Sequence, residues 1–190
     1  MESFFIKKKH IFISLIILIL AIAGLTAYKK IMTGNMVQEE AVRVILETSM
    51  GEIVIELAKD MPITAGNFEK LVKEGFYDGV IFHRVIDGFM IQGGDPDGTG
   101  RGGPGYTIKD EFVGEQKNNR GTIAMANAGP NTGGSQFFIN LVDNNFLDGR
   151  HPVFGRVVEG MEVVDKIAKV QTDGNDRPVD EVKIISARII

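Results

Sequence analysis

Two stretches of this 190-residue sequence decide the fold: FHRVIDGFMIQGGD at residues 82–95 and MANAGPNTGGSQFFI at residues 125–139. Both alternate short apolar runs with glycine, asparagine or aspartate, which is typical of short strands joined by tight turns. The chain repeats this pattern from residue 41 onward. It predicts strands near residues 42–47, 52–57, 80–86, 89–93, 122–126, 135–140, 153–158 and 181–189.

Alternation within the first stretch predicts which side chains share a face, because successive residues of a strand point to opposite sides. The expected groups are Phe82, Arg84 and Ile86 in one strand and, in the next, Phe89 with Ile91 and Met90 with Gln92.

Two helices are predicted between these strands. The first has Asp60 as a plausible N-cap and Pro62 in its first turn, and it ends at Gly75. The second covers residues 161–170, where apolar residues recur at helical spacing. Two helices and about eight short strands without a β-α-β rhythm predict a mainly β fold, a closed eight-stranded antiparallel barrel capped by two α-helices. The glycine-rich residues 95–121 are expected to form a long surface loop.

The first 40 residues differ from this domain. Three lysines at residues 7–9 precede an uncharged apolar run at residues 11–28. As a helix this run would be about 27 Å long, near the lower end of what spans a bilayer. Lysines before the span favour a cytoplasmic N-terminus, with the rest of the chain outside the cell membrane. We expect a permanent single-pass anchor; secretion after cleavage near Ala23 is the alternative.

The expected organisation therefore has four parts. They are a basic cytoplasmic N-terminus at residues 1–10, a hydrophobic helix at 11–28 that is a transmembrane anchor or uncleaved signal, a linker at 29–40, and one domain at 41–190.

Charge and residue content exclude several kinds of partner. The net charge is −4, and the residues after position 40 carry 16 basic and 22 acidic side chains, so nucleic acid is not an expected partner. Without cysteine the chain has no disulfide, thiol nucleophile or cysteine zinc site. Neither His83 nor His151 has a second ligand at metal-binding spacing, so we expect no metal and no other cofactor.

Two short motifs fail for lack of context. Gly98, Gly100 and Gly103 match a dinucleotide-binding fingerprint, but Pro104 follows where a helix should begin. The sequence around Ser135 lacks the final glycine of a nucleophile elbow, and no helical pattern follows it.

The two opening stretches, with NFLDGRHPVFG at residues 145–155, resemble the signature of the cyclophilin family of peptidyl-prolyl isomerases. The resemblance extends over about residues 42–190. It implies an enzyme that accelerates rotation about X-Pro bonds of proline-containing polypeptides. Because the domain is expected to lie outside the membrane, we expect this enzyme to assist the folding of exported or surface proteins, and we take a monomer as the default. The alternative is a non-catalytic module that holds proline-containing segments in the same groove.

The resemblance also implies roles for individual residues. Arg84 corresponds to the catalytic arginine of the family. The residues that match the proline-ring pocket are Phe89, Met90, Phe138 and Leu147. Those that match positions lining the groove and holding the peptide backbone are Gln92, Ala126, Asn127, Gln136 and His151.

Phe146 departs from the pattern, because many family members carry tryptophan at this position. Phenylalanine keeps the aromatic bulk of the substrate-binding surface but lacks the indole N–H donor. We therefore expect isomerase activity to be largely retained and cyclosporin binding to be weakened.

Overall fold

The computed structural model describes residues 20–21, 23–25, 41–114 and 116–190. The chain divides into two compact units, residues 1–40 and residues 41–190. The predicted N-terminus and linker lie outside the described residues, as does most of the predicted span; its five described residues are helical. Within the described part of the chain, no helix has both the length and the apolar content needed to cross a membrane.

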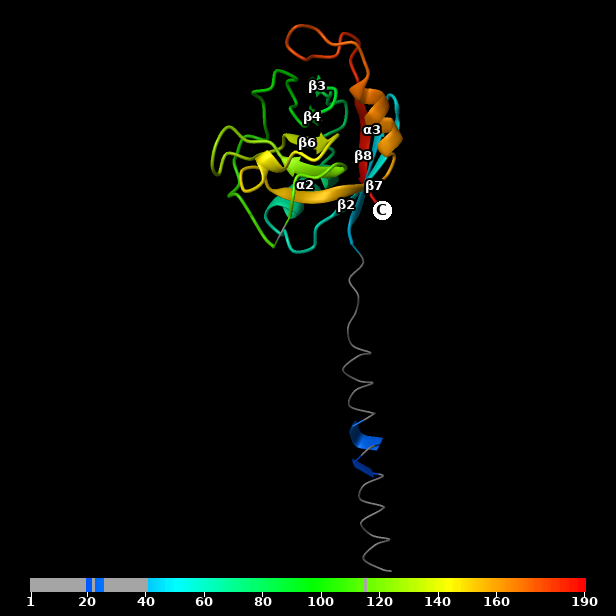
Figure 1. Cartoon of the computed structure of the whole chain (residues 1–190), viewed down its shortest axis with the longest axis vertical. Coiled ribbons are helices and arrows are strands. Elements are labelled where there is room, and N and C mark those ends of the chain that lie inside the picture. The colour runs from blue at the N-terminus through cyan, green and yellow to red at the C-terminus, as the bar shows by residue number, and fades with distance from the viewer. Residues whose placement is uncertain (1–19, 22, 26–40, 115) are drawn as a thin grey trace, which may run out of the picture. The chain divides into compact units, whose positions relative to one another are not determined.

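An eight-stranded antiparallel sheet forms the framework of residues 41–190 (Figure 1). Its strands are β1 Arg43–Thr48, β2 Gly51–Leu57, β3 Arg84–Ile86, β4 Met90–Gly93, β5 Thr122–Met125, β6 Phe137–Asn140, β7 Val153–Glu159 and β8 Ile184–Ile189. They are hydrogen-bonded in the order β3-β4-β6-β5-β7-β2-β1-β8. Each lies within a few residues of a predicted strand.

The closure of the sheet differs from the predicted barrel. β3 and β8 are its two edges, and they do not pair as strands. Short segments before them meet instead, through an isolated bridge between Ile81 and Lys183 and a 2.9 Å hydrogen bond from the Phe82 N–H to the Val182 carbonyl. The fold is therefore a curled, half-barrel sheet. The closing bonds are made by residues 79–82, before β3 begins, so β3 itself takes no part in them.

Two α-helices complete the core. They are α2 Thr64–Lys73 and α3 Met161–Ala168, and a short 3₁₀ helix, η1, covers Asn145–Leu147. α2 packs against β7 and β8, and α3 packs against β2, β3 and β4. Their apolar faces join the sheet in one large buried set, the inner cluster, which includes Phe68, Leu71, Tyr77, Phe137, Phe154, Val164 and Ile167.

The start of α2 corrects one prediction. The helix begins at Thr64, and the preceding cap residue, Ile63, makes no side-chain cap bond, so Asp60 is not its N-cap. The Glu111 carboxylate from the long loop accepts hydrogen bonds from the N–H groups of Ile63 at 3.1 Å and Thr64 at 2.8 Å. A residue 47 positions away thus supplies the cap that local sequence was expected to provide.

The prediction of which side chains share a face is confirmed inside the strands and is wrong just outside them. Arg84 and Ile86 share a face, but Phe82 lies in the inner cluster with Val85, because regular alternation begins only at Arg84. Phe89 likewise precedes β4 and packs beside Met90 rather than with Ile91.

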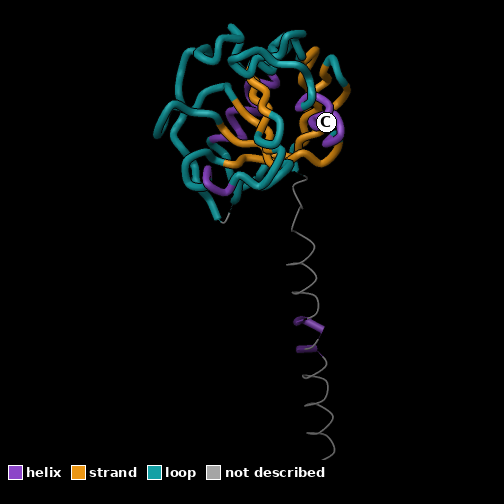
Figure 2. The backbone as a smooth tube through the Cα atoms, turned by 45° about the horizontal axis from the view of Figure 1, so that its top comes forward, coloured by secondary structure: helices purple, strands orange, loops and turns teal. Residues whose placement is uncertain are grey.

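Loop backbone makes up much of the domain and wraps around the strands (Figure 2). The described residues between β4 and β5 form the expected long loop, whose single ladder contact is a bridge from Ile108 to Gly133. Asp95 anchors the start of this loop and is fully buried. Burial by itself would raise the pKa of Asp95, but hydrogen bonds from the N–H groups of Asp97, Gly102 and Gly100 outweigh it and lower the pKa.

Candidate active site

The register of four strands aligns two rows of side chains on opposite faces of the sheet. Val85, Ile91, Ile139 and Ile123 are cross-strand partners and form the inner row, which belongs to the inner cluster. The residues next to them form the outer row. Its members, in order across β3, β4, β6 and β5, are Arg84, Gln92, Phe138 and Ala124.

An apolar cluster lies on the outer face. A second, smaller buried set, the outer cluster, consists of Met90, Ala124, Phe138 and Val153. The partly buried residues that pack around it are Ile86, Phe89, Ala126 and Leu147. The structure thus brings all four predicted pocket residues, Phe89, Met90, Phe138 and Leu147, into one cluster.

Arg84 lies at the β3 end of the outer row. Its side chain is 44% exposed, and its Nε donates a 3.3 Å hydrogen bond to the carboxylate of Asp176. Asp176 is 92 positions further along the chain, and nothing in the sequence pattern marked it as part of the site. Gln92 separates Arg84 from Phe138 in the row, so the backbone of Arg84 lies two strand spacings of about 4.8 Å each from that of Phe138.

Two glutamines form a polar edge beside the outer cluster. Gln92 Nε2 donates to Gln136 Oε1 at 2.9 Å, and Gln136 Nε2 donates to the Gly102 carbonyl at 2.9 Å. The Gln136 carbonyl accepts the Ala126 N–H at 3.0 Å. These bonds connect β4, the residues before β6 and the long loop, so the amide groups are held in place before any peptide binds.

Asn127 lines one groove with Gln92 and Gln136, whereas His151 contacts the outer cluster through Phe138. His151 Nδ1 is 3.1 Å from the Met125 carbonyl, and its ring meets the Phe138 ring edge-on at 5.4 Å. A carbonyl only accepts hydrogen bonds, so Nδ1 carries the proton, and Nε2 is the acceptor in the neutral ring. Asn127 Nδ2 donates to the Arg150 carbonyl at 2.8 Å.

Phe146, in η1, extends the apolar surface of the outer cluster. Its side chain is 66% exposed, and its ring stacks on that of Phe89 with a centroid distance of 5.9 Å and an angle of 20°. The aromatic surface expected at this position is therefore present, without an N–H donor.

His83 is the titratable neighbour of Arg84 in the chain. It is buried, and neither ring nitrogen has a hydrogen-bond partner among the described residues. Burial lowers the pKa of His83; Asp95 opposes this, whereas the positive charges of Arg177 and Arg84 add to it. The ring is consequently neutral at pH 7 and adds no charge beside Arg84.

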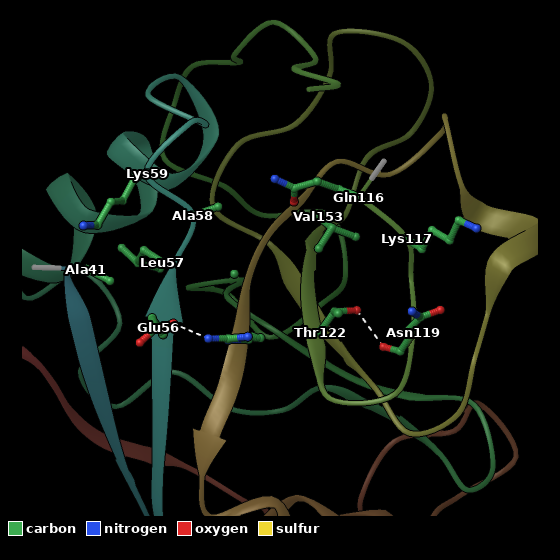
Figure 3. Close-up of a pocket in the computed structure, with 12 residues that line it drawn as sticks. Ala41, Glu56, Leu57, Ala58, Lys59, Gln116, Lys117, Asn119, Thr122 and Val153 are labelled. Atoms are coloured by element: carbon green, nitrogen blue, oxygen red, sulfur yellow. Dashed lines mark hydrogen bonds and ion pairs between the residues drawn. The ribbon is translucent and has the colours of Figure 1, made fainter. Parts of the chain in front are cut away.

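Three cavities border the site. The smallest, of about 130 Å³, is lined by His151, Val153 and residues 111–114 of the long loop. A groove of about 630 Å³ is lined by Gln92, Gln136 and residues 100–107 of the long loop, and so continues the polar edge. A separate cavity of about 460 Å³ lies over β2, β7 and residues 116–119 (Figure 3). There Glu56 bonds Arg156, and the cavity shares Val153 with the outer cluster while its lining contains no predicted site residue.

Metal-binding groups do not gather in the described part of the chain. No set of three or more histidine, aspartate or glutamate side chains lies there in a position to hold a metal ion. The described residues of the site offer the Arg84 guanidinium, fixed amide groups and an apolar cluster, with Arg101 in the adjoining groove.

Comparison with known proteins shows which family this chain resembles. Residues 43–189 match the family described as cyclophilin type peptidyl-prolyl cis-trans isomerase. Peptidyl-prolyl cis-trans isomerase-like 1 of Homo sapiens is 53% identical over 149 residues, which cover 76% of this chain and 90% of that protein. A peptidyl-prolyl cis-trans isomerase of Arabidopsis thaliana is 51% identical over 152 residues, covering 77% and 93%.

Solved structures agree with the sequence relatives. A crystal structure of a cyclophilin type isomerase from Cryptosporidium parvum has a TM-score of 0.76 and 37% identity, and the match covers 79% of this chain and 98% of that one. Another, determined in the presence of the dipeptide Ala-Pro, has a TM-score of 0.75 and 38% identity, covering 78% and 98%.

The curled antiparallel sheet, with an apolar cluster and Arg84 on its outer face, has the fold of the cyclophilin-type isomerases matched above. The chain belongs to the cyclophilin family and is a cyclophilin-type peptidyl-prolyl cis-trans isomerase.

Proposed function

We propose that Arg84 is the electrostatic catalyst of this isomerase and that the outer cluster binds the proline ring of the substrate. The observation that carries the proposal is the outer row, where a half-exposed guanidinium shares a sheet face with Gln92 and the nearly buried ring of Phe138. A relative in this family was crystallised in the presence of Ala-Pro, which supports a proline-containing ligand here.

The reaction explains why a single charged donor suffices. Resonance makes the C–N bond partly double, and rotation about it has a barrier of ~18–20 kcal/mol. In the twisted state the prolyl nitrogen regains a lone pair. A guanidinium that donates to this nitrogen binds the twisted state more tightly than the planar one, which is the condition for catalysis. Arginine keeps its charge even when partly desolvated, whereas lysine loses its proton more readily.

The remaining site residues restrain the substrate. The outer cluster holds the proline ring on one side of the X-Pro bond, and groove donors and acceptors hold the flanking backbone. One side of the bond is then fixed while the other rotates. The proposed backbone-holding residues are Gln92, Ala126, Asn127, Gln136 and His151. Millisecond catalysis requires about four decades over the uncatalysed ~10–100 s, or roughly 5.4 kcal/mol. One oriented donor contributes about 2.7–4 kcal/mol of this, and restraint of the substrate is proposed to contribute the remainder.

An isomerisation assay on a prolyl peptide tests the assignment, with residues 41–190 as the enzyme. We expect Arg84→Ala to lower kcat/KM by about 100- to 1,000-fold, the range found when an oriented transition-state donor is removed. Arg188→Ala is the matched control, since it removes an exposed, ion-paired arginine from β8. Equal rates for wild type and Arg84→Ala would refute the catalytic role. Peptide binding without acceleration by wild type would instead favour a binding module.

We also propose that the enzyme is tethered to the cell membrane by residues 11–28, with its domain outside, where it assists the folding of exported or surface proteins. The support is the triple lysine at residues 7–9 followed by the apolar run. The mass of the mature N-terminus and a carbonate wash of membranes test this together. An intact N-terminus that resists the wash supports the anchor, and a terminus cut near Ala23 shows secretion instead.

A further inference from the structure

The segment between α3 and β8 is a small fixed hairpin, not a loose connection. Thr172 and Pro178 form a bridge, and the Asp173 N–H donates to the Arg177 carbonyl at 2.8 Å. The Asp173 carboxylate also accepts the N–H groups of Asn175 at 2.8 Å and Arg177 at 3.0 Å. Bonds from Arg177 and Asn175 lower the pKa of Asp173, so these contacts hold throughout the neutral range.

The tip of this hairpin is attached to the strand that carries Arg84. Figure 1 shows the hairpin in orange beyond α3, and the Asp176 carbonyl accepts the Val85 N–H of β3 at 2.8 Å. Asp176 has a φ of 64°, in the left-handed region that aspartate, asparagine and glycine tolerate best. Arg177 adds a second attachment by donating to the Gly98 carbonyl at 2.5 Å.

This attachment places one carboxylate on one edge of the Arg84 guanidinium. Asp176 accepts from Nε at 3.3 Å, whereas the two terminal nitrogens of Arg84 have no partner among the described residues. A guanidinium has five N–H donors in a rigid plane, so fixing Nε orients the other four. The unpaired donors are those available to a bound peptide.

We propose that Asp176 is a positioning residue that holds the Arg84 guanidinium ready to donate its terminal N–H groups to the prolyl nitrogen. The proposal rests on the catalytic role proposed for Arg84. Asp176 acts through Arg84 and does not touch the substrate. Because both side chains are 44% exposed, the contact is screened by water, and the expected effect on catalysis is modest.

The test uses the full chain with Asp176→Gly and Asp176→Asn, two residues that keep the left-handed backbone. We expect Asp176→Gly to lower kcat/KM about threefold, through kcat rather than KM, with an unchanged thermal midpoint; this lies within the range of an exposed ion pair. Asp176→Asn retains an oxygen acceptor, so its kcat/KM should fall less than that of Asp176→Gly. The matched control is Asp180→Asn, which removes the same charge from an exposed residue just beyond the hairpin.

A spectroscopic measurement separates positioning from a general loss of structure. The ¹⁵N–¹H resonance of Arg84 Nε should shift and broaden in Asp176→Gly and should remain unchanged in Asp180→Asn. In the Arg84→Ala background, adding Asp176→Gly should change kcat/KM no further, because the group that it positions is absent.

The outcomes distinguish the two proposals. Wild-type activity in Arg84→Ala would refute the catalytic role on which this inference rests. A strong loss in Arg84→Ala together with unchanged kcat and an unchanged Nε resonance in Asp176→Gly would overturn the positioning role alone. An equal loss in Asp180→Asn would also overturn it, since only net charge would then matter.

Discussion

The inner and outer rows use the same four strands and the same register, yet they have opposite compositions. The inner row is Val85, Ile91, Ile139 and Ile123, and each of these is at most 2% exposed. The outer row changes along its length from the charged Arg84 through Gln92 to Phe138 and Ala124. A strand that places its residues alternately on two faces can thus build a core and a binding surface simultaneously.

The difference has a physical cause in what covers each face. The inner row is enclosed by the curl of the sheet and by both helices, so polar groups there would lose water without compensation. The outer row packs with a smaller set of residues, which includes partly buried Ile86, Phe89, Ala126 and Leu147. Charged and amide groups are tolerated at the edge of this set because they keep contact with water, as the 44% exposure of the Arg84 side chain shows.

The largest effect on stability is expected when a side chain of the inner row is truncated. Ile139→Ala should lower the free energy of unfolding by about 2–5 kcal/mol, because Ile139 is fully buried and its loss leaves a cavity. Urea unfolding measures this loss. Activity per folded molecule should remain at the wild-type level at a temperature where the variant is folded. A large drop in kcat for the folded variant would contradict the division between the rows.

The neighbouring residue provides the converse test. Phe138→Leu should lower kcat/KM about tenfold, or ~1.4 kcal/mol, because the aromatic floor of the proposed proline site is lost. Its stability should change by less than about 1.5 kcal/mol, since leucine conserves most of the apolar volume. The isomerisation assay and urea unfolding are compared on the same preparation. Unchanged kcat/KM would remove Phe138 from the site.

His83 tests whether a buried, unpaired ring next to the outer row limits stability. Its pKa in the folded state lies below the unfolded value of about 6.5, so the unfolded chain binds the proton first as the pH falls. The free energy of unfolding is therefore unaffected by His83 above about pH 6.5. Below that pH, protonation of His83 in the unfolded chain lowers the free energy of unfolding by less than about 1.4 kcal/mol per pH unit. Urea unfolding at pH 7.5 and 5.5 measures the decline. His83→Gln should reduce it, and an equal decline in the variant would exclude His83 as its source.

The smallest effect is expected at the rim, at Phe146. Phe146→Trp restores an indole N–H and should raise cyclosporin affinity about two- to fivefold, or ~0.5–1 kcal/mol for one exposed hydrogen bond. Isomerisation should change by less than about twofold, because the stacked aromatic surface with Phe89 is kept. Titration calorimetry measures the affinity. No gain would show that the missing donor is not what limits drug binding.

Local pattern predicted the strands well and failed where residues distant in sequence meet. The eight strands and both helices were predicted within a few residues, since periodicity reports which face is buried. The helix cap supplied by Glu111, the burial of Phe82 and the contact between Phe89 and Met90 were missed. Each depends on a turn or loop whose path is set by the packing of the whole domain.

The sequence by itself determined the family and the alternation that separates the two rows, and it supplied the residues that we propose for the site, from Arg84 to His151. These follow from local spacing and from signature stretches, which a chain carries whether or not it is folded. Only the tertiary structure decided that the sheet curls without full strand closure and that Asp176 lies against Arg84. A contact between residues 92 positions apart depends on the packing of α3, β8 and the hairpin between them, and no local pattern encodes it.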